Sequence, residues 1–202
     1  MLTLKSRVAV FITLFTLALA GCDMVQPASK GSFNAVDITG AEYAKDFQLT
    51  DHTGKARSLG DFKGKVVLLF FGFTHCADIC PTTLSDAAKA IKNLEGDGGR
   101  VQVLFVTVDP RRDTPEVLAK YVPAFNPGFL GLYGNEEATQ KAAKDFRVFY
   151  QQRPVAESGG DYSMDHMGGT LVFDSRGRLR LFINYGMAAD KIAADLRKLL
   201  TS

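Results

Sequence analysis

Two cysteines separated by three residues are the part of the sequence with the clearest chemical potential. Cys76 and Cys80 lie in the segment GFTHCADICP, residues 72–81. The apolar run before them indicates the end of a buried strand, and Pro81 suits the first turn of a helix. A helix amino terminus stabilises negative charge and so favours thiolates. Thiolates bind soft metal ions and also exchange disulfides, and either use is open to this pair.

The spacing of the pair favours a metal site over a purely structural disulfide. Dedicated exchangers of the thioredoxin type have two residues between the cysteines, whereas three residues here give a wider bite that can grip a metal. A disulfide that closes so short a loop would add only about 2 kcal/mol in the loop-closure model. Two thiolates suit a soft ion such as Cu(I), whereas structural zinc takes four ligands, and no second cysteine pair supplies them.

The elements that must position these cysteines follow from the hydrophobic pattern. Two continuous apolar runs, 65–71 and 101–108, are typical of buried central strands. Thr114 and Pro115 have the pattern of a helix start. The whole order, β-α-β-α-(β-α-β)-β-β-α, predicts an α/β chain with a thioredoxin-like fold, in which helices flank a central mixed sheet. A hairpin at 47–59 is expected as an N-terminal extension.

A third metal ligand would have to come from one of three histidines. His52 falls in the turn of the predicted hairpin. His75 adjoins Cys76, but in an extended loop its side chain would point away from that sulfur. His166 precedes the strand expected at 169–173, and in a thioredoxin-like sheet the loop before that strand faces the cysteine loop. This placement favours His166, although a lone histidine is more often structural.

Three motifs resemble those of the SCO/SenC family, whose members bind copper and serve cytochrome c oxidase assembly. The similar segments are THCADICP at 74–81, DPRRDTP at 109–115, and YSMDH at 162–166 followed by TLVFD at 170–174. They occur in the family's order and span residues 70–177, and weaker similarity extends over 42–200. The resemblance implies a thioredoxin-like fold and one copper ion per chain, Cu(I) or Cu(II), held by Cys76, Cys80 and His166.

The resemblance also implies a metallochaperone that delivers copper to the binuclear copper site of cytochrome c oxidase. Its partners would be the copper-accepting oxidase subunit, an upstream copper donor and a thiol reductant. The alternative is an enzyme, a thiol-disulfide oxidoreductase that uses Cys76 and Cys80 without metal, either to reduce the acceptor's cysteines or in redox defence. A copper sensor or assembly scaffold is a third, weaker interpretation.

The sequence departs from the family pattern in three places. Ala77 and Ser175 stand where such motifs usually carry proline. Gly168 and Gly169 make the chain after His166 pliant, which leaves the placement of this side chain open. None of these departures removes a ligand.

Several side chains near the motifs have roles that the sequence leaves open. Met164 and Met167 flank His166 and carry soft thioether donors, but packing is their expected role rather than auxiliary copper ligation. Asp78 is either a helix-start carboxylate, or a group that supports the metal ligands or docks a partner protein. Asp109 and Asp113 flank two arginines, and we expect them to form a hydrogen-bonded or ion-paired loop near the site.

The first 21 residues have the features of a lipoprotein export signal. Lys5 and Arg7 supply positive charge, and residues 8–20 form an apolar run that is short for a bilayer. Leu19-Ala20-Gly21-Cys22 has the form of a lipobox. We expect cleavage before Cys22 and lipidation of its thiol; an uncleaved membrane anchor is the alternative.

The expected domain plan is a signal peptide at 1–21, a lipid-anchored flexible tether at 22–41, and a thioredoxin-like copper-binding domain at 42–202. The tether segment is small, polar and aperiodic. Asp23 resembles a signal for retention in the inner membrane. We therefore expect the domain at the periplasmic face of that membrane.

The charge balance excludes the pattern of a nucleic-acid binder. The chain of 202 residues has 24 basic and 22 acidic side chains, and its first 21 residues hold two cations and no anions. The processed protein would therefore be formally neutral. Nucleic-acid binding requires a basic surface, so no such partner is expected.

Overall fold

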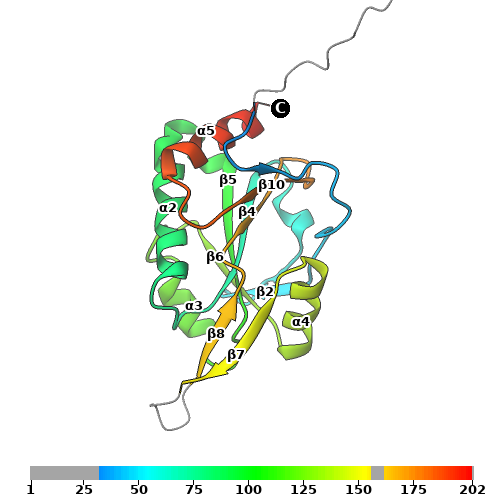
Figure 1. Ribbon diagram of the computed structural model, residues 1–202, viewed down its shortest axis with the longest axis vertical. Coiled ribbons are helices and arrows are strands. Elements are labelled where there is room, and N and C mark those ends of the chain that lie inside the picture. Colours follow the sequence, from blue (N-terminus) through cyan, green and yellow to red (C-terminus); the bar gives the residue numbers. More distant parts are fainter. Residues whose placement is uncertain (1–31, 156–161, 202) are drawn as a thin grey trace, which may run out of the picture. The chain divides into compact units, whose positions relative to one another are not determined.

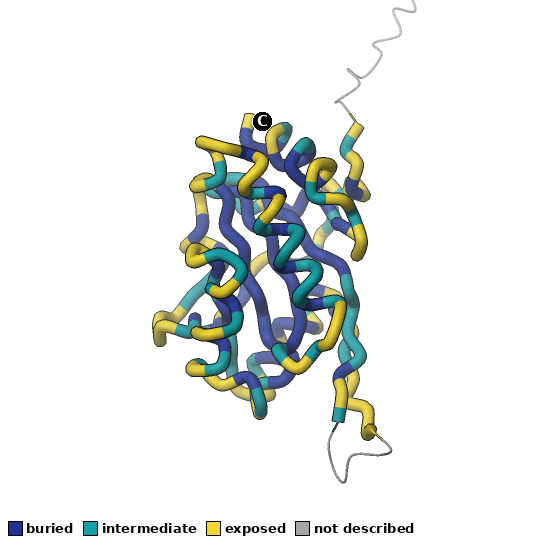
Figure 2. Tube along the Cα trace, turned by 90° about the vertical axis from the view of Figure 1, so that its left-hand side faces the viewer, coloured by how far each residue is buried: buried dark blue, intermediate teal, exposed yellow. Residues whose placement is uncertain are grey.

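The central strands of the main sheet are apolar on both faces, and this determines where the core lies. The computed structural model describes residues 32–155 and 162–201. Every residue is buried in β4 (Val66–Gly72) and in β5 (Val101–Thr107). Figure 2 shows these buried strands running between partly exposed outer elements. The two apolar runs of the sequence therefore form the central strands, as predicted.

The main sheet is mixed and has eight strands. Their order is β1–β10–β9–β4–β5–β6–β2–β3. The outer strands are β1 (Val36–Asp37), β10 (Leu179–Ile183), β9 (Thr170–Phe173), β6 (Leu130–Tyr133), β2 (Leu49–Asp51) and β3 (Ala56–Arg57). Only β4, β5 and β6 run parallel to one another, and the other pairs are antiparallel. The expected N-terminal hairpin is β2–β3, which extends the sheet beyond β6.

Helices cover both faces of this sheet, which confirms the predicted thioredoxin-like α/β fold. They are α2 (Ile79–Asn93), α3 (Pro115–Tyr121), α4 (Glu136–Asp145) and α5 (Ala189–Leu200), with short 3-10 helices at Leu59–Phe62 and Glu95–Arg100. Figure 1 shows α2 and α3 on one side of the sheet and α4 on the other. No helix in the described ranges is long and apolar enough to cross a membrane.

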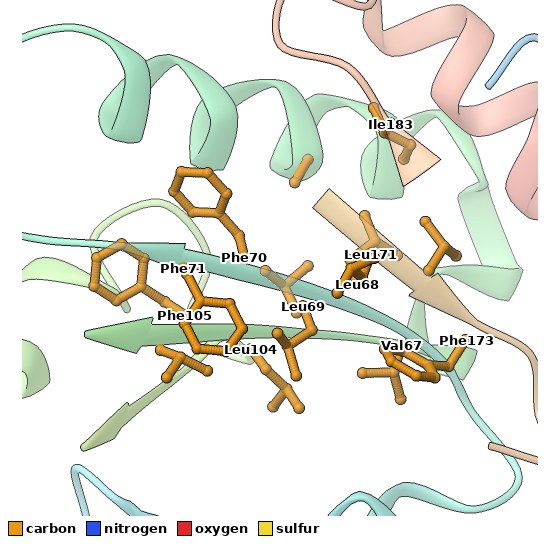
Figure 3. Close-up of a cluster of buried hydrophobic side chains, with 14 of the residues drawn as sticks. Val67, Leu68, Leu69, Phe70, Phe71, Leu104, Phe105, Leu171, Phe173 and Ile183 are labelled. Carbon is orange, nitrogen blue, oxygen red and sulfur yellow. The ribbon is translucent and has the colours of Figure 1, made fainter. Parts of the chain in front are cut away.

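Alternate residues of β4 serve opposite sides of the core. Figure 3 shows Phe70 pointing toward the helix above the strand and Phe71 pointing to the other face. The Phe70 ring lies 6.1 Å from that of Phe105, and the Phe71 ring lies 5.8 Å from that of Phe146. Burial of each such side chain stabilises the fold by about 1.5–3 kcal/mol. The end of β4 is therefore held firmly from both faces.

A separate hairpin stands beside the main sheet. It consists of β7 (Tyr150–Pro154) and β8 (Tyr162–His166), which pair with each other. The sequence predicted an extended segment at 148–153 but placed His166 in a loop. The histidine instead ends a strand, opposite Tyr150. Only Met164 is buried in β8, so the segment lacked the apolar pattern that would have predicted a strand.

The folded unit begins earlier than the expected boundary at residue 42. Val36 and Asp37 form β1, which pairs with β10. The backbone N–H groups of Asn34 and Ala35 both donate to the buried Asp195 carboxylate, at 3.0 and 2.8 Å. Residues 34–41 are therefore part of the domain rather than of the predicted tether. The signal peptide and Cys22 lie outside the described residues.

Candidate metal centre

The two cysteines lie where β4 passes into α2. Asp78 is the N-cap residue of α2, so Cys80 belongs to the first turn and Cys76 to the loop before it. Cys80 is fully buried and Cys76 is partly exposed; neither forms a disulfide. The backbone N–H of Cys80 donates to Cys76 Sγ at 3.4 Å. The start of α2 thus supplies a hydrogen-bond donor to Cys76 Sγ. This agrees with the predicted position of the cysteines at a helix amino terminus.

Close packing at the end of β4 requires a residue without a side chain. A Cβ atom at Gly72 would lie 2.8 Å from Cys80 Sγ and 2.9 Å from the Phe105 ring. Real Cβ atoms do not approach other atoms so closely, so any larger residue would displace the sulfur or the ring. Sequence analysis did not identify Gly72 as part of the site. Its position directly before the cysteine motif was the available signal.

His166 faces Cys80 from the end of β8. Its Nε2 lies 3.3 Å from Cys80 Sγ, and its Nδ1 lies 3.1 Å from the Met167 carbonyl oxygen. Because a carbonyl only accepts, this contact favours the tautomer with the proton on Nδ1 and a lone pair on Nε2. Burial lowers the pKa of His166 and so favours the neutral ring. A neutral imidazole with a free lone pair is the form that binds metals.

Two aromatic rings fix the orientation of this imidazole. The rings of Phe70 and Phe73 each approach the His166 ring edge-on, with centroids 5.7 Å away. Both phenyl side chains are buried. The histidine is therefore held between apolar surfaces, and its lone pair points at the cysteine.

Cys76, Cys80 and His166 together form a group that could hold a metal ion. Their donor atoms all lie within 4.8 Å of one another, and no other cluster of three such residues occurs in the described ranges. Burial raises the pKa of the Cys80 thiol, so metal binding at neutral pH would release its proton. Two sulfurs and one imidazole nitrogen suit a soft ion better than a hard one. The donor set thus fits copper.

A buried aspartate holds the cysteine loop to the end of β5. The Asp113 carboxylate accepts from the Thr74 N–H at 3.0 Å, from Thr74 Oγ1 at 2.5 Å, and from Thr107 Oγ1 at 2.6 Å. Burial nevertheless raises the pKa of Asp113. These contacts fix the loop that leads into Cys76. The sequence predicted a hydrogen-bonded or ion-paired loop at this position, and these hydrogen bonds confirm it, although the two threonine partners were not predicted.

A second set of contacts ties the hairpin to the same loop. The Tyr162 hydroxyl donates to the Asp109 carboxylate at 2.7 Å, and Arg112 Nε donates to the same carboxylate at 2.5 Å. The Arg112 guanidinium also lies 3.7 Å from the centre of the Tyr162 ring. The expected ion pair between Asp109 and a neighbouring arginine is therefore confirmed. Arg111 is paired differently, with Glu136. Through these contacts the second motif positions the strand that ends in His166.

The other two histidines lie outside the cluster. His52 Nδ1 accepts from the Gly131 N–H at 3.0 Å, which joins the β2–β3 turn to β6. His75 is exposed and lies 3.2 Å from Thr74 Oγ1. Both positions agree with the sequence prediction. Met164 is buried and Met167 is partly buried against the core, and both positions suit packing roles.

The chain matches a known protein family and is similar in sequence to several of its members. The SCO1/SenC family model matches residues 36–201. The human protein "SCO2 homolog, mitochondrial" is 39% identical over 155 residues, which cover 76% of this chain and 58% of that protein. A SCO2-like protein of Rickettsia felis is 37% identical over 133 residues, covering 66% and 65%. The chain therefore spans less than two thirds of the length of these two relatives.

Two solved structures share the fold over most of this chain. Apo Sco1 of Thermus thermophilus is 44% identical, with a TM-score of 0.74, and the match covers 84% of this chain and 98% of that one. Copper-bound ScoI of Bradyrhizobium japonicum is 37% identical, with a TM-score of 0.70 and coverage of 77% and 98%. The family match spans the main sheet and all three motifs, and on these grounds the chain belongs to the SCO1/SenC family.

Proposed function

We propose that this protein is a copper metallochaperone that holds one copper ion through Cys76 Sγ, Cys80 Sγ and His166 Nε2. The observation that carries the proposal is the convergence of these donors from two separate elements, with His166 Nε2 3.3 Å from Cys80 Sγ. A disulfide exchanger has no need of an imidazole at this position. The copper-bound relative from Bradyrhizobium japonicum, 37% identical, supports copper as the metal.

The exposure of the donors supports transfer to another protein. Cys80 is fully buried, whereas Cys76 is partly exposed on the loop before α2. An acceptor thiolate can therefore reach a copper ion from the Cys76 side and replace one donor at a time. A site with three ligands leaves a coordination position for this exchange, so that copper need not be released into solvent.

The acceptor in this proposal is the copper-accepting subunit of cytochrome c oxidase, and delivery is to its binuclear copper site. The resemblance of the three motifs to the SCO/SenC family supports this choice. An upstream donor would supply copper to the apo protein. A thiol reductant would keep Cys76 and Cys80 reduced before loading, since only thiolates bind the metal.

Membrane attachment in the proposal runs through a lipid on Cys22. The export-signal features of the first 21 residues and the lipobox support cleavage and acylation there, at the periplasmic face of the inner membrane. Because β1 and its neighbours belong to the folded unit, the proposed tether comprises residues 22–32. Its fully extended reach is about 3.3–3.6 Å per residue.

Thiol-disulfide exchange is the second candidate function, favoured by one observation. The Cys76 sulfur is partly exposed and receives the N–H of Cys80 at a helix start. Exchange requires a thiol that an incoming sulfur can reach, and this position provides one. The two activities use the same sulfurs, but only copper binding uses His166.

The test compares copper loading in the wild-type chain, Cys80→Ser and His166→Ala, with His75→Ala as the matched control. We expect one copper per wild-type chain, loss of tight binding in Cys80→Ser, and loss of the tight Cu(II) form in His166→Ala. His75→Ala should bind like the wild type because this side chain is exposed and outside the cluster. Oxidase copper content in cells should fall with His166→Ala while disulfide exchange persists. Unchanged copper binding and oxidase loading in His166→Ala would favour the oxidoreductase instead.

A further inference from the structure

The backbone that follows His166 is closely packed. Gly168 and Gly169 connect β8, which ends at His166, with β9, which begins at Thr170. A Cβ atom at Gly169 would lie 1.9 Å from Cζ and 2.4 Å from Cε2 of the Phe182 ring in β10. No larger residue fits at this position without displacing the ring. The double glycine therefore lets the chain pass directly against Phe182 after it leaves the histidine.

Gly168 lies beside two side chains that come from other elements. A Cβ atom at Gly168 would meet Ile79 Cγ2 at 3.4 Å and Tyr185 Cβ at 3.6 Å, which are ordinary packing distances. Ile79 is the first residue of α2 and lies between the two cysteines in the sequence, and Tyr185 follows β10. The segment after His166 thus packs against the helix that carries Cys80 and against Tyr185.

Tyr185 also reaches the loop that carries the cysteines. Its hydroxyl donates to Asp78 Oδ1 at 3.3 Å. Asp78 is the N-cap residue of α2, but its carboxylate makes no capping bond to the helix backbone. The carboxylate instead accepts from the hydroxyls of Tyr185 and Thr82. Of the roles that the sequence left open for Asp78, this contact favours support of the metal ligands over simple capping.

The contacts of Tyr185 join the two halves of the site. Gly168 is two residues from His166, and Asp78 is two residues from each cysteine. Core packing is a small part of what Tyr185 contributes, since 44% of the residue is exposed. Tyr185 therefore bridges the segment that follows the histidine and the segment that holds the cysteines.

We propose that Tyr185 is a positioning residue that holds residues 167–169 against the start of α2. This contact keeps His166 Nε2 facing Cys80 Sγ, at 3.3 Å. The inference rests on the proposed function, because it takes His166 to be a metal ligand. Tyr162 attaches the far end of β8 to the domain through the hydrogen bond of its hydroxyl. Tyr185 supplies the attachment at the end that carries the histidine.

The test compares two variants of the full chain: Tyr185→Phe, which keeps the ring and loses the hydroxyl, and Tyr185→Ala, which loses both contacts. Tyr133→Phe, in β6, is the matched control. Amide hydrogen exchange over residues 167–169 of the metal-free protein measures how often this segment opens. Because the bond to Asp78 is exposed, exchange should speed up by only about two- to threefold in Tyr185→Phe. It should speed up by about tenfold in Tyr185→Ala, which also loses the packing on Gly168, and stay unchanged in Tyr133→Phe.

Copper affinity separates a positioning role from simple packing. Cu(II) affinity should fall severalfold in Tyr185→Ala, because binding through the imidazole must then order the segment first. Cu(I) affinity should change less, since two thiolates suffice for this soft ion. The unfolding temperature of the metal-free variant should stay near that of the wild type, because Tyr185 is nearly half exposed. Equal losses of affinity for both copper states, or a clearly lower unfolding temperature, would show a packing role and contradict the inference.

The exchange measurement distinguishes failure of this inference from failure of the proposed function, because it needs no metal. If copper binding proves independent of His166 but Tyr185→Ala still speeds exchange over residues 167–169, the proposed function fails and the positioning role of Tyr185 stands. If Tyr185→Ala shows wild-type exchange over these residues and wild-type Cu(II) affinity, the role of Tyr185 is wrong and the proposed function is unaffected.

Discussion

The two regions that form the metal centre are held in very different ways. β4 and the start of α2, which carry the cysteines, belong to the main sheet, and every residue of β4 is buried. β7 and β8, which end in the histidine, pair with each other outside that sheet, and Met164 is their one buried residue. Two donors therefore lie on a rigid base, and the third lies on a hairpin with little packing of its own.

This difference suits a protein that must both hold and release a metal. Local stability follows buried apolar contact, so a half-exposed hairpin opens at lower free energy than a central strand. Tyr162 attaches the hairpin to the loop that carries Asp109 and Arg112. Its hydroxyl donates to Asp109, and its carbonyl oxygen accepts from Arg112. We infer that the two cysteines keep the metal bound, whereas His166 is the donor whose position can change.

The largest expected effect is on the free energy of unfolding and tests how strongly the main sheet is stabilised. Leu69→Ala in β4 should lower the free energy of unfolding by about 2–5 kcal/mol, because it leaves a cavity at a fully buried position. Phe149→Ala, at the base of the hairpin, should change it by no more than about 0.5 kcal/mol, since 64% of that side chain is exposed. Urea titrations of both variants give the two values. Similar losses of unfolding free energy in the two variants would contradict the difference in stability between the main sheet and the hairpin.

A smaller effect concerns the junction of β4 with the cysteine motif. Gly72→Ala would place a methyl group 2.8 Å from Cys80 Sγ. We expect a loss of about 1–3 kcal/mol in unfolding free energy from overpacking, with weaker copper binding. Gly99→Ala, where a Cβ meets no atom within 4 Å, is the control. Wild-type copper affinity in Gly72→Ala would show that the close approach is unimportant for the metal site.

The smallest effect on stability tests the attachment of the hairpin. Tyr162→Phe removes the hydrogen bond to Asp109 at 2.7 Å. Unfolding free energy should fall by only about 1 kcal/mol, because the buried Asp109 carboxylate keeps its bond from Arg112 Nε. Cu(II) affinity should nevertheless fall several-fold, since His166 loses part of its support, while Cu(I) affinity changes less. Equal losses for the two oxidation states would mean that the hairpin does not act through the histidine.

The same contrast explains how much the sequence alone could predict. The run from Lys65 to Phe71 is apolar on both faces, so its position as a central strand was readable, and the cysteine loop followed from it. β8 has one buried residue, and its pairing with β7 depends on residues of another segment of the sequence. No local pattern therefore identified the strand that ends in His166. Its place before an expected strand favoured this histidine, and the resemblance to the family strengthened that interpretation.

Long-range polar contacts could not be predicted from the sequence either. Asn34 and Ala35 have the composition of linker residues, yet both donate to Asp195, some 160 positions away. Thr74 and Thr107 are ordinary polar residues until the fold brings both to Asp113. Composition and periodicity describe elements, whereas these bonds arise from how the elements meet.

X-ray absorption spectroscopy of the copper-loaded full chain tests the central claim most directly, because it counts the atoms bound to the metal. We expect two sulfur atoms and one imidazole nitrogen around copper in the wild type, and two sulfur atoms without the imidazole in His166→Ala. His75→Ala should give the wild-type spectrum. A wild-type spectrum with no imidazole contribution, or one that His166→Ala leaves unchanged, would contradict the claim that the rigid cysteine pair and the hairpin histidine together bind copper.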